Sequence, residues 1–524
     1  MAKSEIFRKL QRALRSPKVL DRPIDRRAFL KGSLSASALV AAAFVPASGS
    51  LLAGIRDRRT SGRIAVIGAG LAGLSAAYAL RKQGHVSTVF EAATRPGGRV
   101  LTQDRFHQGM FCELGGELID RNHVSLLGLA RELGVEIEEF PPEHRHREDT
   151  LFFIDGRIYT ESQLSRAAAP LVEHVRRDRE QIFGSVEGDI LDSRTAPKYP
   201  TAYRFDRMTL AEYLDGLSDV EPWVKRLVGH AYAAEFGLDL DEQSALNLHL
   251  LVDTDMTDGE FNLFGASDES LRVKGGNSRL VEALTRAVEK GSGPIRYGHR
   301  LLAIAERGTK VGLVFQAPNG SSREMLYDRV VCAIPFSLLR EVEIRSPMTP
   351  RKTAAVARLS YGTHTKALMG TRDRFWRKRH EGVPRSIGSW INDLSSQAYW
   401  DTSRGQVGEG GVLTCFRGGR SGLRNTEWNT IVGGFLAPFT AEDQAKYAGT
   451  MLDARAVMPW ATEPFAKGSY SCPRPGDTTE ILGAAEEPEW GGKLVFAGEH
   501  ASANFGYMDS AVESAFKAIE LLAR

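Results

Sequence analysis

The stretch GRIAVIGAGLAGLSAAYALRKQGHVSTVFEA, residues 62–92, decides the fold class. Its first apolar run leads into Gly68, Gly70 and Gly73, and a helical pattern of Ala and Leu then joins it to a second apolar run that ends at Glu91. In such a unit the glycines permit a tight turn, close approach of the backbone to a pyrophosphate, and close packing of helix on strand. The helix start attracts phosphate, and the acid accepts the ribose hydroxyls. The stretch therefore predicts a dinucleotide site in an α/β fold.

A second glycine pair follows this unit and distinguishes between cofactors. RPGGRV, residues 95–100, places Gly98 and Arg99 just beyond the ribose-binding acid. Flavoproteins place an arginine and a glycine pair at this point, because the arginine neutralises the pyrophosphate and the glycines let the backbone approach the isoalloxazine. The segment therefore favours FAD over NAD, with an ordinary glycine-rich turn as the alternative. Further glycine pairs in CELGGELID (112–120) and RVKGGNSRLVEAL (272–284) support the flavin interpretation.

Length and charge limit the other classes of protein to consider. A chain of 524 residues exceeds what one hydrophobic core organises, which predicts roughly two to three domains. The formal net charge of +3 is unevenly distributed, because residues 1–31 carry ten Lys or Arg against three Asp or Glu. The remainder is mildly acidic, and nothing in it indicates binding of nucleic acid.

The basic start leads into a segment that resembles an export signal. DRRAFLK, residues 25–31, places paired arginines before an Ala-, Ser- and Leu-rich run from Gly32 to Ile55. This pattern is similar to a twin-arginine signal, which predicts export of the folded chain by the twin-arginine translocase to the periplasm or beyond the cell. Residues 1–56 would then be signal and linker. A transmembrane anchor is the alternative, although Pro46 and the small polar residues make the run only weakly apolar.

The ordered motifs of the chain resemble one known family. From residue 62 to the end, the sequence is similar to the flavin-containing amine oxidases, which include monoamine, polyamine and L-amino acid oxidases. The segments that carry the resemblance, besides those quoted above, are VVCAIPFSLL (330–339), THTKALMGTRDRFW (363–376) and VFAGEHASANFGYMDSAVESA (495–515).

The resemblance implies a discontinuous domain organisation. A FAD-binding Rossmann-like domain of the glutathione-reductase-like type would comprise residues 62–125, 272–345 and 460–524, and an α+β substrate domain would comprise residues 126–271 and 346–459. Local patterns agree with a mixed structure. Residues 124–140 have helical apolar spacing, whereas residues 386–392 and 411–418 alternate as strands do, and residues 300–316 suggest a hairpin.

The resemblance also assigns residues to the cofactor. Peptide N–H groups around Met508 and the dipole of the last helix would stabilise negative charge on the flavin pyrimidine ring. Glu499 would hydrogen-bond the ribityl chain, and the Leu301 backbone would contact adenine. Gly506 would be a glycine because the backbone there lies too close to the flavin for a Cβ. The full set of implied FAD contacts is Gly68, Gly70, Gly73, Glu91, Gly98, Arg99, Gly115, Gly116, Leu301, Gly498, Glu499 and Met508.

Two tyrosines and a lysine are the implied catalytic residues. Tyr470 and Tyr507 would be the walls of an aromatic cage for the amine, with plain packing as the alternative for Tyr507. Lys366 would hold a water against flavin N5 and stabilise charge as electrons move to dioxygen; a strand-end lysine that reaches solvent is the alternative. Ser469, rather than a cysteine, precedes Tyr470, so we expect FAD to be bound without a covalent link.

Neither a metal site nor a disulfide framework is predicted. His144 and His146 lie in a charged loop without a second cluster of ligands, which indicates a solvated turn. The cysteines are far apart in sequence, and their pairing stays open: Cys112, Cys332, Cys415 and Cys472.

The implied reaction is oxidation of the C–N bond of a primary or secondary amine, or of an L-amino acid, to an imine that water hydrolyses to a carbonyl compound and ammonia. Electrons would pass to dioxygen, giving hydrogen peroxide, or to another acceptor. L-Amino acid oxidases place an arginine after the pair that corresponds to Gly115 and Gly116, where this chain has Glu117, so Arg121 or an arginine of the substrate domain would have to replace it. A flavin-dependent desaturase or porphyrinogen-type oxidase on the same fold is the alternative, and a homodimer is left open.

Overall fold

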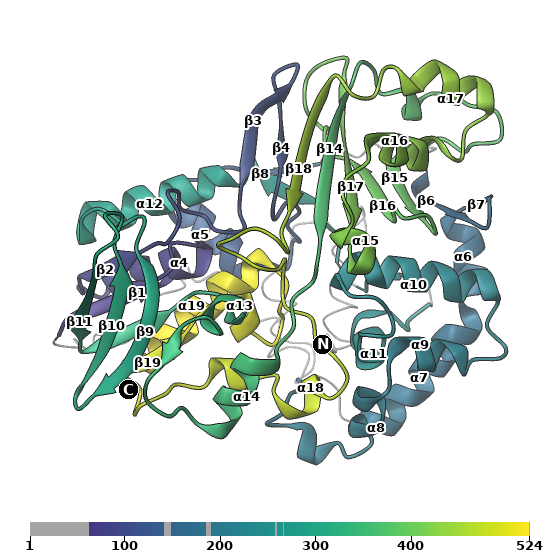
Figure 1. Ribbon diagram of the computed structural model, residues 1–524. Helices are drawn as coiled ribbons and strands as arrows, with labels where there is room; N and C mark the ends of the chain where they lie inside the picture. The colour runs from purple at the N-terminus through teal and green to yellow at the C-terminus, as the bar shows by residue number, and fades with distance from the viewer. Residues whose placement is uncertain (1–61, 141–147, 185–189, 257–258, 266, 523–524) are drawn as a thin grey trace, which may run out of the picture.

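The computed structural model describes residues 62–140, 148–184, 190–256, 259–265 and 267–522 (Figure 1). The predicted export signal and the pair His144 and His146 lie outside these ranges. No helix in the described ranges is long and apolar enough to cross a membrane. The strands form sheets of four, four and seven strands and two separate strand pairs.

A four-stranded parallel sheet forms around the segment that decides the fold class. Its order is β19 (Leu494–Phe496), β12 (Arg329–Cys332), β1 (Ile64–Ile67) and β2 (Ser87–Phe90). Because successive side chains of a strand point to opposite faces, Ile64 and Val66 enter a core with helices on one side. These helices are α4 (Leu71–Lys82), α12 (Ser278–Ser292) and α19 (Met508–Leu522). The layer arrangement confirms the α/β fold class (Figure 1).

The other face of the parallel sheet packs on a second sheet. Its order is β11 (Ser322–Tyr327), β10 (Lys310–Gln316), β9 (Arg300–Arg307) and β13 (Glu343–Ile344), and β9 and β10 form the predicted antiparallel hairpin. Ala65 and Ile67 of β1 enter this core. Phe90 stacks on Phe315 with 4.1 Å between ring centroids, which ties the two sheets together. Two helices flank this region: α13 (Phe336–Leu339) and α14 (Pro350–Arg358).

A seven-stranded sheet forms the upper right part of the molecule in Figure 1. Its order is β18 (Ala454–Pro459), β14 (Thr365–Thr371), β17 (Gly411–Arg417), β16 (Ala398–Asp401), β15 (Ser386–Asn392), β6 (Glu148–Ile154) and β7 (Arg157–Tyr159). The strands predicted at 386–392 and 411–418 are thereby confirmed. Ala367 and Met369 face a core with α16 (Trp428–Leu436) and α17 (Ala441–Ala448). The neighbouring residue Lys366 therefore points to the opposite face of the sheet.

A helical layer packs beneath the seven-stranded sheet. Its buried residues form one apolar core that also contains Phe152 and Ile391 of the sheet. The helices are α6 (Glu161–Ala167), α7 (Ala169–Phe183), α8 (Ala202–Arg207), α9 (Leu210–Asp215), α10 (Pro222–Phe236) and α11 (Leu246–Leu251). Two further short helices are α15 (Gly419–Leu423), which follows β17 in the chain, and α18 (Asp477–Glu480), which precedes β19.

The prediction of one helical pattern over residues 124–140 is only partly right. Helix α5 covers Val124–Glu132, and β5 (Ile137–Glu139) then pairs with β8 (Leu271–Val273). The helix ends early because Gly134, just after it, has a left-handed φ of 68°. A further strand pair, β3 (Thr102–His107) with β4 (Met110–Glu113), leads back to the glycine pair before Glu117.

The three predicted FAD-binding stretches each supply a strand to the parallel sheet, namely β1, β12 and β19. The exact limits of the two domains stay a prediction.

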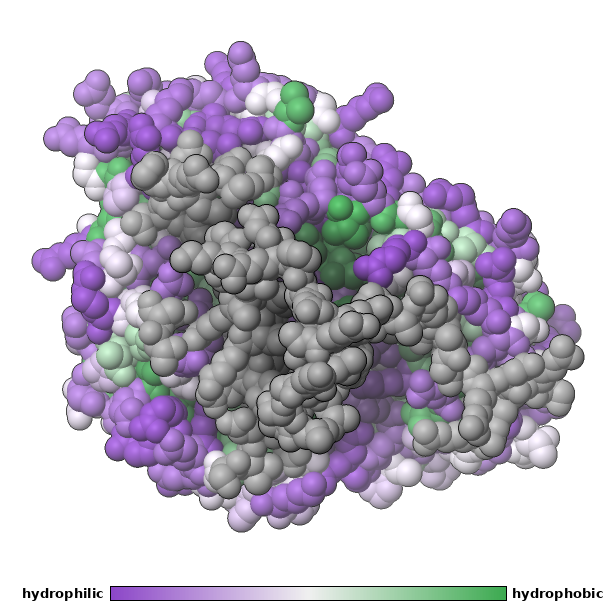
Figure 2. Space-filling view, turned by 180° about the vertical axis from the view of Figure 1, so that it is seen from behind, coloured by the Kyte–Doolittle hydropathy of each residue, from purple (hydrophilic) through white to green (hydrophobic). Residues whose placement is uncertain are grey.

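Outside its grey residues, the face in Figure 2 is mainly hydrophilic. Exposed large apolar side chains are scattered along the described sequence, for example Val86, Val407 and Leu423.

Candidate active site

One large cavity connects the glycine loop to the predicted aromatic residues. It encloses about 1550 Å³, whereas a cavity for a single small ligand typically holds about 300–1,000 Å³. Of the residues predicted from the sequence, all except Gly73 line this cavity. Its volume suits a dinucleotide together with a second, smaller molecule.

The glycine loop presents an open helix start to the cavity. Gly70 is the N-cap of α4, and no side chain caps the helix there. A Cβ on Gly70 would meet no atom within 4 Å, so the space above this glycine is open. Gly73 instead packs inward, because a Cβ there would overlap the carbonyl oxygen of Gly68. Both observations fit the roles that the spacing predicts for these glycines.

Glu91 is fixed at the end of β2. Its Oε2 accepts a hydrogen bond from the Ala69 amide at 2.6 Å, and its Oε1 accepts one from the Ala93 amide at 2.8 Å. Each carboxylate oxygen can accept a further hydrogen bond. The carboxylate is therefore held by backbone at the cavity wall with capacity left for ribose hydroxyls.

Arg99 and Glu499 form an ion pair in the middle of the cavity wall. Arg99 Nη1 lies 2.9 Å from Glu499 Oε1 and also donates to the Ser469 carbonyl. Glu499 further accepts from Ser471 Oγ at 2.8 Å and from the Gly506 amide at 3.0 Å. Burial acts to raise the pKa of Glu499, but the charge of Arg99 and these hydrogen bonds outweigh it and hold the pKa below its usual value. Contact with a ribityl chain stays a prediction.

Two glycines let the β4 loop lie close to its neighbours. A Cβ on Gly115 would overlap the Arg99 carbonyl oxygen, and one on Gly116 would lie 2.9 Å from Met508 Sδ. Helix α19 begins at Met508, as predicted, so its first turn faces the cavity. Gly506 has φ of 90°, and its Cβ would make only ordinary contact with Tyr470. Left-handed backbone therefore explains this glycine within the structure.

Leu301 and Gly498 complete the predicted cofactor residues. Leu301 is buried in β9 and lines the cavity, and the Gly498 amide donates to Ser514 Oγ at 2.9 Å. Taken together, the open space at Gly70, the uncapped helix start and the anchored Glu91 fit FAD, and Ser469 offers no thiol for a covalent link.

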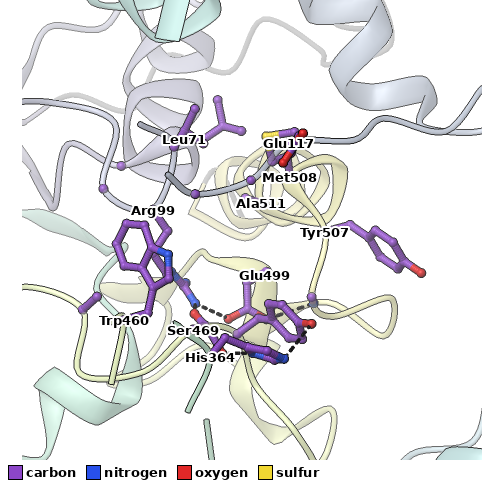
Figure 3. A pocket seen from close by; sticks show the side chains of 18 of the residues that line it. Leu71, Arg99, Glu117, His364, Trp460, Ser469, Glu499, Tyr507, Met508 and Ala511 are labelled. Atoms are coloured by element: carbon purple, nitrogen blue, oxygen red, sulfur yellow. Dashed lines mark hydrogen bonds and ion pairs between the residues drawn. The ribbon is translucent and has the colours of Figure 1, made fainter. Parts of the chain in front are cut away.

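The aromatic end of the cavity contains Tyr470, Tyr507 and His364. The His364 ring lies 4.7 Å from the Tyr470 ring and stacks on Phe416 at 4.4 Å. Figure 3 shows Tyr507 standing apart from His364 and Ser469, on the loop that leads into Met508. Both tyrosines line the cavity, which leaves room for a ligand between them.

His364 is a site residue that the sequence did not indicate. Its Nε2 donates to the Ala234 carbonyl at 2.7 Å, and its Nδ1 lies 2.6 Å from Ser469 Oγ, which donates. Burial lowers the pKa of His364 to about 4, so the ring is neutral at neutral pH. A His-Thr-Lys run on a strand carries no signal that separates such a residue from a core histidine.

Lys366 is buried, rather than reaching solvent at a strand end. It is 4% exposed, and its Nζ lies 2.8 Å from Glu117 Oε2. The same ammonium donates to the carbonyl oxygens of Gly115 at 2.9 Å and Glu113 at 3.2 Å. These three acceptors match the three protons of an ammonium group. The predicted water-holding role stays a prediction, and Glu117 is a partner that the sequence did not identify.

Charged residues around the aromatic end were also missed. Glu235 on α10 and Glu269 before β8 line the cavity, and so does Arg404 after β16. Burial, followed by the charge of Asp120, raises the pKa of Glu235 to about 7, whereas Glu269 is exposed where it lines the cavity. Arg404 Nε is buried and has no hydrogen-bond partner within the described chain.

Arg121, which the sequence offered in place of the missing carboxylate-binding arginine, lines the cavity, and its role there stays a prediction. Its side chain is 46% exposed and pairs with Asp268 at 2.8 Å and with Glu139. In the described chain the four cysteines are free and buried: Cys112, Cys332, Cys415 and Cys472. No disulfide therefore links the elements that bear the site.

Comparisons with known proteins agree with the site. Residues 71–521 match the family described as flavin-containing amine oxidoreductase. The flavin-dependent L-tryptophan oxidase RebO of Lentzea aerocolonigenes is 30% identical over 88% of this chain and 98% of that protein. An L-amino-acid oxidase of Vipera ammodytes ammodytes is 22% identical over 89% of this chain and 93% of that protein.

Solved structures show the same fold. Cyclohexylamine oxidase from Brevibacterium oxydans superposes with a TM-score of 0.72 at 20% identity, covering 88% of this chain and 99% of that one. A putrescine oxidase with putrescine bound gives a TM-score of 0.70 at 18% identity, with the same coverage.

This chain belongs to the flavin-containing amine oxidoreductases. The predicted resemblance, the fold class, the non-covalent FAD and an oxidoreductase activity on amines or amino acids are thereby confirmed at the level of the family.

Proposed function

We propose that this chain oxidises a primary amine whose carbon chain carries a second cationic group, such as a diamine. The observation that supports the proposal is the pair Glu235 and Glu269, whose side chains line the cavity near Tyr470 and Tyr507. Within the described chain neither carboxylate forms a salt bridge, although the charge of Arg404 acts on Glu269 from a longer distance. A cation that enters a cavity of low dielectric constant is attracted strongly to such carboxylates.

The aromatic residues would position the reacting amine. Tyrosine faces attract a cationic or lone-pair-rich nitrogen, and His364 and Phe416 hold the Tyr470 ring in place. Fixed orientation of the C–H bond lowers the barrier without any further chemistry from the protein. FAD, when bound, supplies the oxidation of the C–N bond. Water then converts the imine to a carbonyl compound and ammonia, and dioxygen as acceptor yields hydrogen peroxide.

An L-amino acid is the second candidate substrate, and Arg404 is the observation that favours it. The buried Nε of Arg404 lacks a partner, and guanidinium groups bind carboxylates well. The Arg404 guanidinium lies 4.4 Å from the centre of the Phe140 ring, which would orient it toward the cavity that both residues line. The relatives named as L-amino acid oxidases support the same candidate.

Replacing Glu235 or Glu269 by glutamine should discriminate between the two candidates. For a diamine we expect KM to rise by about tenfold in each variant, because an attractive carboxylate is lost, whereas a monoamine of equal length should change by less than about twofold. Glu442→Gln, an exposed carboxylate on α17 outside the cavity, is the control. Steady-state assays of ammonia release give the values. Activity confined to α-amino acids, and lost in Arg404→Met, would establish the second candidate instead.

The same assays, repeated at several pH values, test a second prediction about KM. Because burial raises the pKa of Glu235 to about 7, this carboxylate ionises as the pH rises through that value. A substrate ammonium keeps its charge until its own pKa, about 10 for a lysine-like amine. The KM for a diamine should therefore fall between about pH 6 and pH 8, and less so in Glu235→Gln.

We also propose that the chain is exported to the periplasm by the twin-arginine translocase, as its basic start and paired arginines suggest. Changing Arg26 and Arg27 together to lysine should leave the protein in the cytoplasm with FAD bound. Fractionation of cells expressing each form, followed by immunoblotting, measures this. Undiminished recovery of the lysine variant from the periplasm would reject the proposed route.

A further inference from the structure

We infer that Glu117 restrains the reaction of the reduced cofactor with dioxygen by neutralising the ammonium of Lys366. The inference rests on the proposed function only in requiring an oxidisable and reducible FAD in the cavity. It does not depend on which amine or amino acid is the substrate. The reaction concerned transfers two electrons and two protons from reduced FAD to dioxygen and forms hydrogen peroxide.

The ion pair between Lys366 and Glu117 is buried and well defined. Glu117 Oε2 lies 2.8 Å from Lys366 Nζ, and the side chains are 7% and 6% exposed. Glu117 Oε1 accepts hydrogen bonds from Thr402 Oγ1 at 3.0 Å and from Trp400 Nε1 at 3.1 Å. Three donors therefore fix this carboxylate beside the ammonium, and rotation of Glu117 away from Lys366 would leave Trp400 Nε1 without its acceptor.

The ion pair belongs to the cavity wall between the cofactor end and the aromatic end. Lys366 and Glu117 both line the cavity, and Gly115, which accepts from Lys366, packs against Arg99. Figure 3 shows Glu117 beside Met508 and Ala511 at the start of α19. If a dinucleotide cofactor binds at Glu91 and an amine binds at Tyr507, the redox-active ring of the cofactor has to lie beside this wall to reach the amine.

The ion pair changes the electrostatic environment of the reduced cofactor. Electron transfer to dioxygen develops negative charge beside the cofactor, and a fixed positive group stabilises that charge in a site of low dielectric constant. An opposite charge 2.8 Å from the ammonium cancels most of its field over longer distances. Glu117 is therefore a positioning and charge-setting residue, and the reduced cofactor would persist long enough for other electron acceptors to compete with dioxygen.

A cycle of charge variants tests the inference in the FAD-loaded protein. The cofactor is reduced with dithionite, so no substrate is needed, and is then mixed with dioxygen in a stopped-flow instrument. Glu117→Gln should reoxidise about tenfold faster than the wild type, and Lys366→Met about tenfold slower, since each step changes the local charge by one unit. The double variant should lie within about threefold of the wild type, because replacing both members restores neutrality.

The midpoint potential of bound FAD is a second readout that does not measure activity. It should shift in the positive direction in Glu117→Gln and in the negative direction in Lys366→Met, since positive charge favours the reduced anionic cofactor. Asp206→Asn removes another buried carboxylate, which binds Ser244 and Thr479 outside the cavity, and should leave rate and potential unchanged.

Two outcomes would overturn the inference. One is a Glu117→Gln protein that binds FAD but reoxidises no faster than the wild type. The other is an acceleration that persists unchanged in the double variant, since the effect would then not act through Lys366. If Glu117→Gln fails to retain FAD, the comparison between the double variant and Lys366→Met tests the inference. The double variant must then reoxidise faster than Lys366→Met.

Discussion

Replacing Gly73 by alanine should lower the free energy of unfolding by about 3 kcal/mol or more. A Cβ at this position would overlap the carbonyl oxygen of Gly68 and approach the Ala333 side chain. These atoms belong to the layer where α4 packs on the parallel sheet, and backbone there has little freedom to move. The helix would have to shift away from β1. Urea unfolding of the purified variant, followed by circular dichroism, measures the loss.

Gly70→Ala is the matched control on the same loop. Its Cβ would meet no atom within 4 Å, and its φ of −69° suits any residue, so stability should change by less than about 0.5 kcal/mol. The methyl group would however project into the cavity where a pyrophosphate has to approach the backbone. FAD affinity should therefore fall by about tenfold or more. Equal losses of stability in the two variants would contradict these separate roles.

Replacing Arg99 by methionine should cost about 3–5 kcal/mol of stability at neutral pH, because breaking a buried ion pair leaves an uncompensated charge. The charge in question is that of Glu499, which is 5% exposed and keeps only Ser471 and Gly506 as donors once Arg99 is gone. Loss of the arginine should also release FAD. Thermal unfolding and flavin fluorescence of the filtrate measure the two effects.

The pH dependence of this loss has a definite sign. In the wild type the pKa of Glu499 is held below its usual value, so its stabilising contribution is present at neutral pH and is lost as the pH falls through that lowered pKa. Without Arg99, burial raises the pKa, and the variant gains stability as Glu499 takes up a proton. The difference between wild type and variant should therefore narrow from pH 8 to about pH 5.

Adding Glu499→Gln to Arg99→Met is the rescue experiment, because the amide removes the uncompensated charge. We expect it to recover more than half of the lost stability at neutral pH. A loss that is independent of pH and unaffected by the second change would show that Arg99 acts through packing rather than charge.

The cofactor end of the site could be predicted because its requirements are local in sequence. The tight turn, the open helix start and the acid at the end of the second strand all lie within residues 62–92, and each needs a particular residue type. The same holds for Gly115 and Gly116, where any side chain would meet Arg99 or Met508. Such steric requirements are visible in a single sequence.

The substrate end could not be predicted, because it assembles ordinary residues from distant elements. Glu235 is one acid on α10, Arg404 is one arginine in a loop, and only the fold brings them into one cavity. The sequence also indicated Lys366 without its partner, since Glu117 lies 249 positions away. Charge pairs of this kind depend on tertiary structure alone.

Anaerobic addition of a diamine to the FAD-loaded chain tests the central claim most directly. The visible absorbance of the oxidised flavin is followed with time, and ammonia is determined at the end. We predict that the absorbance is lost at a rate that saturates with diamine concentration and that ammonia forms in proportion to the bound FAD. A flavin that dithionite reduces but that stays oxidised with diamines, monoamines and L-amino acids alike would contradict the account.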